Sequence, residues 1–485
     1  MSIKKTPQKP AEVFGRQHEW DLLIDHLVGE RTGSQLAVVI GRRRQGKSAL
    51  LDSAATATGA FYWEAAQQSR EQNLVAFGEA WGNHVGAPGP LRFADWTAAL
   101  AAVFSQTSPL VLLDEVGYLV ETAPEFPSLL QRYFGPQAER SGTARMVLCG
   151  SIIAQMTKLL AVNAPLRGRH HLVIDVAPFD YRSAAEFWGL GSNPDAAFRL
   201  HALVGGTPAY RRFAGGHTPE RGNVDRWAVR HLLDPASPLF HEGQLLVAED
   251  PTLVDKSLYW GVLGAVADGN SSRGSIAKAV GRTSPALAQS IDVLTAGRWI
   301  EQRRDPFHER STTIALTDPM LRTYRVLIAP ERARLAANRA GDVWADAQPT
   351  LARTVLAPHL EWMANDWMIR HASADTVGGG IRSSTPGVLR PRTRAWQIDV
   401  VALAPDRNDV DRVTAIGEVK ATKEPIGVQE LYRLDEIAVA LGDRGAPLIK
   451  RVLVARAGFT AELGRESRRR ADVELVDLDR LYSGT

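Results

Sequence analysis

One eight-residue motif, G-x-x-x-x-G-K-S, constrains the fold of this chain more than any other feature. It consists of Gly41, Arg42, Arg43, Arg44, Gln45, Gly46, Lys47 and Ser48, and it follows the apolar run 36–40, which predicts a buried strand. In such a loop, backbone N–H groups surround a polyphosphate, the lysine reaches the β and γ phosphates, and the serine hydroxyl ligates Mg²⁺. The next residue, Ala49, begins a helix whose N-terminal dipole faces the anion. The motif therefore predicts an ATP site with bound Mg²⁺.

A second apolar run ends in two acidic residues. Residues 110–113 lead directly into Asp114 and Glu115, the Walker B pattern of a nucleotide site. In this pattern we expect Asp114 to hold Mg²⁺ and Glu115 to orient the water that attacks the γ-phosphate. A third apolar run, 145–149, ends before Ser151, which we expect to contact the γ-phosphate or that water. The alternative is a set of strands that end in solvated polar residues.

Length and composition exclude several classes of protein. The chain has 485 residues, enough for about three domains, and no apolar stretch reaches the roughly twenty residues that span a membrane. A single cysteine, Cys149, excludes an internal disulfide and a cysteine-based metal cluster. The N-terminus lacks the apolar core of a signal peptide. We therefore expect a cytoplasmic protein with no membrane contact, and a net charge of +3 is too small to indicate nucleic-acid binding by itself.

The alternation of strand-like and helix-like segments predicts an α/β fold with a parallel sheet over residues 1–190, followed by a helical lid over residues 191–250. A loop just after the third of these strand segments carries Arg167 and Arg169. Such arginines can act as fingers on the ATP of a neighbouring subunit, which requires a homo-oligomer. The alternative is that both arginines lie on a solvated loop.

Residues 251–330 predict a winged helix-turn-helix: three helical segments at 258–266, 272–280 and 284–296, followed by two strands around a tip at residues 305–307. Such a module places its second helix in the major groove of DNA, here with residues 282–284 and Gln289, and its wing arginines on phosphates. Basic runs at 390–394 and 465–470 add candidate phosphate contacts. The alternative is that the winged helix only connects domains or contacts a protein.

Residues 340–485 contain a second group of candidate catalytic residues. A strand at 395–403 carries Asp399, and the next strand carries Glu418 and Lys420 on one face because side chains alternate along a strand. Two carboxylates that bind Mg²⁺ or Mn²⁺, with a lysine beside the attacking hydroxide, are what metal-dependent phosphodiester cleavage requires. Glu361, on a preceding helix, is a candidate third ligand. The alternative is a surface strand on which acidic and basic residues alternate.

In their order along the chain, these motifs resemble the archaeal-type ATPases of the STAND/AAA+ group that carry a winged helix and a C-terminal nuclease-like domain of the PD-(D/E)XK type. The matching segments are 14–16, 41–48, 113–115, 149–151, 165–169, 205–210, 398–402 and 417–420. The resemblance implies a restriction-endonuclease-like fold for residues 340–485. One departure is Gln397, which stands where an acidic residue is frequent in the family. The resemblance therefore implies one carboxylate fewer around the metal ion.

Two functional hypotheses follow from the sequence. The first is an ATP-hydrolysing protein that binds DNA and cleaves it with a divalent metal. The second is a nucleotide-dependent switch that binds DNA or a partner protein through a catalytically inactive nuclease-like domain. The completeness of the set Asp399, Glu418 and Lys420 favours the first hypothesis, and the arrangement of the three side chains distinguishes the two.

Overall fold

The computed structural model describes residues 6–30, 32–390, 394–406 and 408–485. The chain forms two compact units: the first comprises the chain up to Pro178 together with Thr207–Ala209, and the second comprises Phe179–Gly206 and Tyr210–Thr485. Apart from Thr207–Ala209, the segments predicted as lid, winged helix and nuclease-like domain thus share the second unit. Helix α9 (Tyr181–Phe187), which the sequence analysis placed before the boundary at residue 190, belongs to that unit because it packs on α10 (Pro194–Val204).

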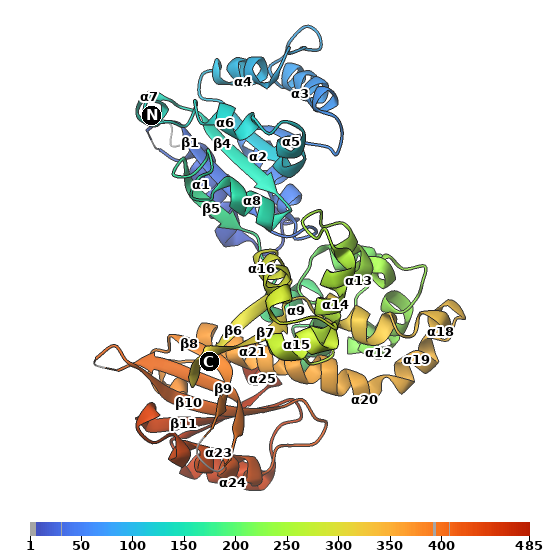
Figure 1. Cartoon of the computed structure of the whole chain (residues 1–485), viewed down its shortest axis with the longest axis vertical. Helices are drawn as coiled ribbons and strands as arrows, with labels where there is room; N and C mark the ends of the chain where they lie inside the picture. The colour runs from blue at the N-terminus through green and yellow to red at the C-terminus, as the bar shows by residue number, and fades with distance from the viewer. Residues whose placement is uncertain (1–5, 31, 391–393, 407) are drawn as a thin grey trace. The chain divides into compact units, whose positions relative to one another are not determined.

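The first unit is built on a five-stranded sheet in which every pair of neighbouring strands is parallel (Figure 1). Its order is β2-β3-β4-β1-β5, with bounds β1 (Gln35–Ile40), β2 (Phe61–Glu64), β3 (Leu110–Asp114), β4 (Arg145–Gly150) and β5 (His170–Asp175). Apolar runs without alternation form these inner strands because helices cover both faces of the sheet. The predicted α/β fold with a parallel sheet is confirmed, and all strands end at one edge.

Helices cover the two faces of this sheet. They are α1 (Gln17–Val28), α2 (Lys47–Thr58), α3 (Arg70–His84), α4 (Trp96–Phe104), α5 (Val116–Thr122), α6 (Phe126–Leu130), α7 (Ala138–Ser141) and α8 (Ile153–Leu159). One core joins α1 and α2 to strand residues such as Val39 and the buried Cys149, and a second core joins α3 and α4 to residues such as Val38. Successive strand residues belong to different cores because their side chains point to opposite faces.

The second unit begins with a helical region. Its elements between Phe179 and the C-terminal sheet, besides α9 and α10, are α11 (Ala209–Phe213), η1 (Glu220–Gly222), α12 (Val224–Trp227), η2 (Ala228–Leu232), α13 (Pro238–Ala248), α14 (Lys256–Ala267), α15 (Arg273–Ala279), η3 (Pro285–Leu287), α16 (Ala288–Ala296), α17 (Pro319–Thr323), η4 (Tyr324–Ile328), α18 (Arg332–Ala336), α19 (Ala340–Asp346), α20 (Gln348–Leu351), η5 (Ala352–Leu356), α21 (Ala357–Arg370) and α22 (Ala374–Val377). One continuous core joins these helices to the C-terminal sheet, and it includes Leu360 of α21 together with Val400 of the sheet.

A β-hairpin follows α14, α15 and α16. Strands β6 (Ile300–Asp305) and β7 (His308–Leu316) pair antiparallel, as predicted for the two strands at this position. The buried Asp305 at its tip accepts hydrogen bonds from the backbone N–H of Phe307 (2.8 Å) and of Val388 (3.2 Å). A Cβ at Gly387 would lie 2.6 Å from Pro306, so only glycine allows this close approach. The hairpin tip is therefore fixed on β8 (Ser383–Leu389).

The C-terminal part of the second unit is a mixed five-stranded sheet in the order β12-β11-β10-β9-β8. Its remaining elements are β9 (Trp396–Pro405), β10 (Asp411–Lys420), α23 (Val428–Leu441), η6 (Gly442–Arg444), β11 (Gly445–Ala455), α24 (Ala461–Arg469), β12 (Val473–Asp477) and α25 (Leu478–Ser483). Strands β8, β9 and β10 pair antiparallel, whereas β10, β11 and β12 pair parallel. Helix α23 covers one face and α21 the other, so β9 and β10 lie inside this α/β layer (Figure 1).

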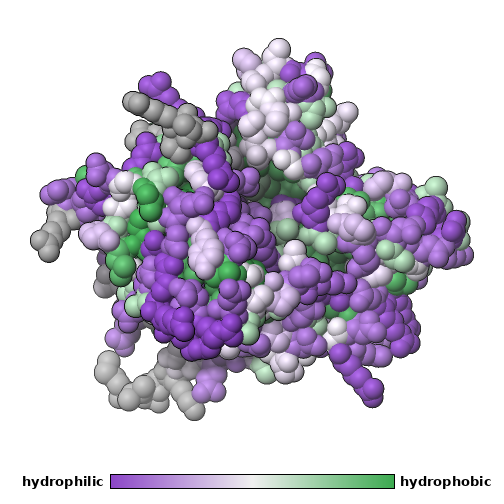
Figure 2. Space-filling view, turned by 90° about the horizontal axis from the view of Figure 1, so that it is seen from below, coloured by the Kyte–Doolittle hydropathy of each residue, from purple (hydrophilic) through white to green (hydrophobic). Residues whose placement is uncertain are grey.

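The surface is predominantly hydrophilic on the face shown in Figure 2, where hydrophobic side chains lie in small groups among polar ones. Exposed large apolar residues such as Val162, Val254 and Val439 lie far apart in the sequence, the first two in loops and the third on α23. Over the described ranges, none of the helices has both the length and the apolar character needed to cross a membrane.

Candidate functional site

The phosphate loop connects β1 to α2 at the edge where the parallel strands end. Gly41, Arg44 and Gly46 have positive φ values of 156°, 70° and 87°. A Cβ at Gly41 would lie 2.4 Å from the carbonyl oxygen of Val176, so this position requires glycine. Gly46 precedes α2, a helix of 12 residues, and no side chain caps the helix. The uncapped N–H groups of the first turn, where Ser48 and Ala49 are exposed, fit a polyphosphate.

Two charged residues of the predicted site are buried beside this loop. The ammonium of Lys47 donates a hydrogen bond to the carbonyl oxygen of Arg42 (2.9 Å). The carboxylate of Asp114, at the end of β3, is fully buried and accepts a hydrogen bond from the backbone N–H of Glu115 (2.8 Å). The Asp114 carboxylate at the end of β3 and the Ser48 hydroxyl in the first turn of α2, both at the edge where the parallel strands end, are suitable oxygen donors for the Mg²⁺ that accompanies a nucleotide.

Tyr62 also contacts this site, although the sequence analysis did not single it out. Its hydroxyl donates a hydrogen bond to the second carboxylate oxygen of Asp114 (3.1 Å). Burial, and then the negative charge of Asp114, raise the pKa of Tyr62 well above its usual value, so the phenol keeps its proton and remains a donor. The contact exists because β2 pairs with β3, with Tyr62 opposite Leu112 and Glu64 opposite Asp114.

The second Walker B residue belongs to a chain of polar contacts. Glu115, with a φ of 48°, accepts a hydrogen bond from the hydroxyl of Ser151 (2.8 Å). Arg43 of the phosphate loop donates to the same hydroxyl (3.4 Å) and to the hydroxyl of Tyr118 (2.5 Å). The sequence analysis expected Ser151 to contact the γ-phosphate or the attacking water. In this structure the Ser151 hydroxyl contacts Glu115, the residue assigned to orient that water, and its contact with the γ-phosphate or the water stays a prediction.

Two other segments noted in the sequence, 14–16 and 205–210, contribute hydrogen bonds that hold the phosphate loop. Arg16 donates hydrogen bonds to the carbonyl oxygens of Gln45 (3.2 Å) and Ala177 (2.5 Å). The side-chain amide of the buried Gln45 donates to the hydroxyl of Thr207 (3.1 Å). Residues far apart in the sequence therefore hold the conformation of the loop, which explains why Thr207–Ala209 belong to the first unit.

The two predicted arginine fingers lie at the other edge of the sheet. Arg167 is exposed and Arg169 is half-buried, both in the turn that precedes β5. Strand β5 pairs parallel with β1, and its first residue pairs with Leu36, whereas the phosphate loop follows Ile40. At about 3.3 Å per residue, the length of the strand keeps both arginines roughly 15 Å from the phosphate loop of the same chain. A role on ATP would therefore require a second subunit.

The predicted acidic residues of the C-terminal domain lie close together. Asp399 on β9 accepts a hydrogen bond from the backbone N–H of Val419 (2.9 Å). Burial, and then the charges of Glu418 and Glu361, raise the pKa of Asp399 to about 7. Burial also raises the pKa of Glu361 on α21, while Arg303 and Arg322 oppose that rise.

Glu418 has both carboxylate oxygens committed to cations of the chain. Oε1 accepts a hydrogen bond from the ammonium of Lys420 (2.6 Å), and Oε2 forms an ion pair with the guanidinium of Arg433 on α23. Among the residues that the structure describes, no group of three or more His, Cys, Asp or Glu side chains could hold a metal ion. In this arrangement, Asp399, Glu418 and Glu361 do not fit the predicted Mg²⁺ or Mn²⁺ site, because the chain's own cations already neutralise Glu418.

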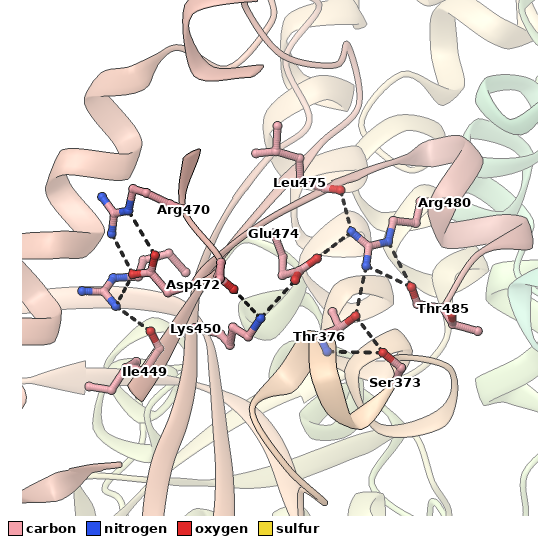
Figure 3. Close-up of polar contacts among 12 residues, drawn as sticks. Ser373, Thr376, Ile449, Lys450, Arg470, Asp472, Glu474, Leu475, Arg480 and Thr485 are labelled. Carbon is pink, nitrogen blue, oxygen red and sulfur yellow. Dashed lines mark hydrogen bonds and ion pairs between the residues drawn. The ribbon is translucent and has the colours of Figure 1, made fainter. Parts of the chain in front are cut away.

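One predicted basic run is partly committed to internal ion pairs, as Figure 3 shows for Arg470 and Asp472. Arg470 binds Asp472 (2.8 Å) and Asp435 (2.7 Å). In the same network, Lys450 and Arg480 both bind Glu474, at 3.2 and 3.0 Å. The remaining arginines of the run, at positions 465, 468 and 469, are exposed. Residues 391–393 of the other basic run lie outside the described residues.

The parallel sheet, the phosphate loop after β1 and the acidic pair after β3 together define a P-loop ATPase. Residues 23–210 match a family model described as an ATPase domain predominantly from Archaea, so this part of the chain is an archaeal-type ATPase domain.

Two known proteins are similar to a larger part of the chain. An uncharacterized protein of Methanocaldococcus jannaschii is 24% identical over 303 residues, which cover 61% of this chain and 63% of that relative's length. The chain thus matches less than two thirds of this curated relative. The structure of the Walker-type ATPase PABY2304 of Pyrococcus abyssi is similar with a TM-score of 0.50 and 18% identity, covering 66% of this chain and 98% of that one. This likeness shows a shared fold.

Proposed function

We propose that this chain hydrolyses ATP with Lys47, Ser48, Asp114, Glu115 and the backbone of residues 41–46. The observation that carries the proposal is the N-terminus of α2, which no side chain caps and whose first residue is the buried Lys47, together with the buried carboxylate of Asp114 at the end of β3. Backbone N–H groups and Lys47 bind the β and γ phosphates. Ser48 and Asp114 would hold Mg²⁺, which neutralises charge on the phosphate oxygens.

Glu115 positions the attacking water in this proposal. The water oxygen attacks the γ-phosphorus, a water proton moves toward the Glu115 carboxylate, and the bond to the β-phosphate oxygen breaks to release ADP. The hydroxyl of Ser151, which donates to Oε2 of Glu115, fixes the orientation of this carboxylate. Arg43 links Ser151 to the phosphate loop and thus to the bound nucleotide.

Two substitutions separate binding from turnover. Lys47→Ala removes the cation that contacts the phosphates, so ATP binding should be lost, whereas Glu115→Gln should retain ATP binding and lose about 10²- to 10⁴-fold in kcat. Matched controls are Lys158→Ala and Glu121→Gln, which change exposed residues on α8 and α5. Binding is measured with a fluorescent ATP analogue and turnover by phosphate release. Normal turnover by Glu115→Gln would contradict the Walker B assignment.

We also propose that the second unit binds DNA, with α14, α15, α16 and the β6–β7 hairpin as a winged helix-turn-helix. Three helices followed by an antiparallel hairpin support this assignment, and Arg282, Gln289 and Arg304 are exposed. Arg303 instead pairs with Glu301 (2.9 Å), so it contributes less to phosphate binding. The protein in this proposal is a cytoplasmic homo-oligomer in which Arg167 and Arg169 contact a neighbour's ATP.

The nuclease-like domain has two candidate roles. The first role, metal-dependent DNA cleavage, would require a divalent ion to displace Lys420 or Arg433 from Glu418, which lies near Asp399 and Glu361. The ion pairs of Glu418 with Lys420 and Arg433 favour the second role, in which the domain binds DNA or a partner protein without cutting. A cleavage assay on linear, branched and single-stranded DNA, with Mg²⁺ or Mn²⁺ and with or without ATP, distinguishes them. Cleavage that is lost in Asp399→Ala, with ATP hydrolysis retained, would establish the first role.

A further inference from the structure

We infer that Arg433 is the resident cation of the C-terminal carboxylate site and keeps divalent ions out of it. The inference concerns the occupant of this site and does not depend on ATP hydrolysis in the first unit. It rests on the position of the guanidinium, the burial of Glu418 and the oxygen atoms that surround both groups.

The guanidinium of Arg433 connects two neighbouring strands. One of its nitrogens forms the ion pair with Oε2 of Glu418 on β10, and the other donates a hydrogen bond to the main-chain carbonyl oxygen of Gln397 on β9 (2.7 Å). A planar guanidinium with donors in a fixed fork is well suited to bridge two acceptors in this way, and a lysine ammonium is a point charge. The guanidinium of Arg433 therefore lies between the carbonyl group of Gln397 on β9 and the carboxylate of Glu418 on β10.

The partner of this cation is poorly solvated. The side chain of Glu418 is 7% exposed, whereas those of Arg433 and Lys420 are 29% and 35% exposed. A carboxylate removed from water needs a counter-charge, and here it has two. A divalent ion that entered the site would have to displace a cation that is already paired with Glu418 and held by a carbonyl group.

The same contacts show what would happen if the guanidinium were absent. The carbonyl oxygen of Gln397 and Oε2 of Glu418 would both lose their donor. Carbonyl and carboxylate oxygens are the ligands that Mg²⁺ and Mn²⁺ prefer, and Asp399 lies close enough for Glu418 to affect its pKa. Removal of Arg433 should thus convert a site for an internal cation into a site for a metal ion.

Lys420 provides the comparison within the same site. Its ammonium binds Oε1 of Glu418 at 2.6 Å and also lies 3.7 Å from Glu430, so it bridges two carboxylates, whereas the side chain that binds the Gln397 carbonyl is that of Arg433. Loss of Lys420 would leave Arg433 in place between the two strands. We therefore expect Lys420→Gln to leave metal exclusion largely intact, unlike Arg433→Gln.

The test is Mn²⁺ binding to the full-length chain without nucleotide, measured by electron paramagnetic resonance of free Mn²⁺. Binding to the wild type should be unchanged by Glu418→Gln, because the wild-type carboxylate holds no metal. The Arg433→Gln chain should bind one more Mn²⁺ than the wild type does. Its affinity for Mn²⁺ at the Glu418 site should be at least tenfold higher than that of the wild type, and adding Glu418→Gln should abolish this binding. Arg394→Gln is the matched control, because the ion pair of Arg394 is with Glu436 on α23, whereas Glu418 pairs with Lys420 and Arg433.

Two outcomes would overturn the inference. One is wild-type Mn²⁺ binding that weakens when Glu418 is replaced by glutamine, which would show that a metal enters despite Arg433. The other is a folded Arg433→Gln chain that gains no Mn²⁺ site. The wild-type comparison decides the question even if Arg433→Gln does not fold. Because the readout is metal binding, an inactive ATPase site would leave the result unaffected.

Discussion

Replacement of Tyr62 by phenylalanine tests whether this residue positions the magnesium carboxylate of the ATP site. The substitution keeps the aromatic ring, and thus the packing of β2 against its neighbours, and removes only the hydroxyl that donates to Asp114. Asp114 keeps its hydrogen bond from the N–H of Glu115, so the carboxylate loses one of its donors and retains others. The prediction is a weaker and less well oriented metal ligand in an otherwise intact site.

The magnitude follows from the charge and burial of the two partners. A hydrogen bond to an ionised group contributes about 1.5–3 kcal/mol. Asp114 is fully buried but Tyr62 is only half-buried, so water can partly replace the hydroxyl and the lower value applies. About 1.5 kcal/mol corresponds to roughly tenfold in an equilibrium constant. Loss of an outer hydrogen bond to a metal ligand typically weakens metal affinity by about 10- to 100-fold, which agrees with this estimate.

The assay is phosphate release at saturating ATP over a range of Mg²⁺ concentrations. We expect Tyr62→Phe to raise the half-maximal Mg²⁺ concentration about tenfold, with the KM for ATP within about twofold of the wild type. Tyr133→Phe is the control, because Tyr133 stacks on Phe104 away from the loop. A Mg²⁺ dependence identical to that of the wild type would refute the role of Tyr62, and an equal loss in the control would indicate a general effect on folding.

Three other predictions address different parts of the chain. Mixing Arg167→Ala/Arg169→Ala subunits with Lys47→Ala subunits should restore part of the ATPase activity, because each type supplies what the other lacks, and a strictly monomeric chain with full turnover would exclude this. DNA affinity of the second unit should fall steeply as salt rises, since phosphate contacts release counterions, and salt-independent binding would indicate a protein partner instead. Asp305→Asn should destabilise the second unit by about 1 kcal/mol, because an amide has one acceptor oxygen for two partly buried backbone N–H groups, and an unchanged thermal unfolding curve would show that the hairpin tip is not fixed there.

The resemblance and the motifs predicted more of the first unit than of the second. The phosphate loop and Walker B strand were predictable because their chemistry is local: consecutive residues supply the left-handed glycines, the helix N-terminus and the carboxylates. The parallel order of the strands followed from the alternation of apolar runs with helices, and the match over residues 23–210 agrees with the ATPase assignment. The winged helix and the nuclease-like domain remain predictions, since their motifs are short and their elements are common to many folds.

The sequence by itself determined which residues can bind phosphate and which segments form strands, because those properties depend on neighbours along the chain. Only the tertiary structure decided which groups meet. Tyr62 reaches Asp114 through the pairing of β2 with β3, and Ser151 reaches Glu115 from the end of β4. Likewise, the register of β9 and β10 and the face that α23 turns toward them place Arg433 on Glu418. Strand register and helix orientation are fixed by packing over the whole unit, so no local pattern in the sequence could reveal these contacts.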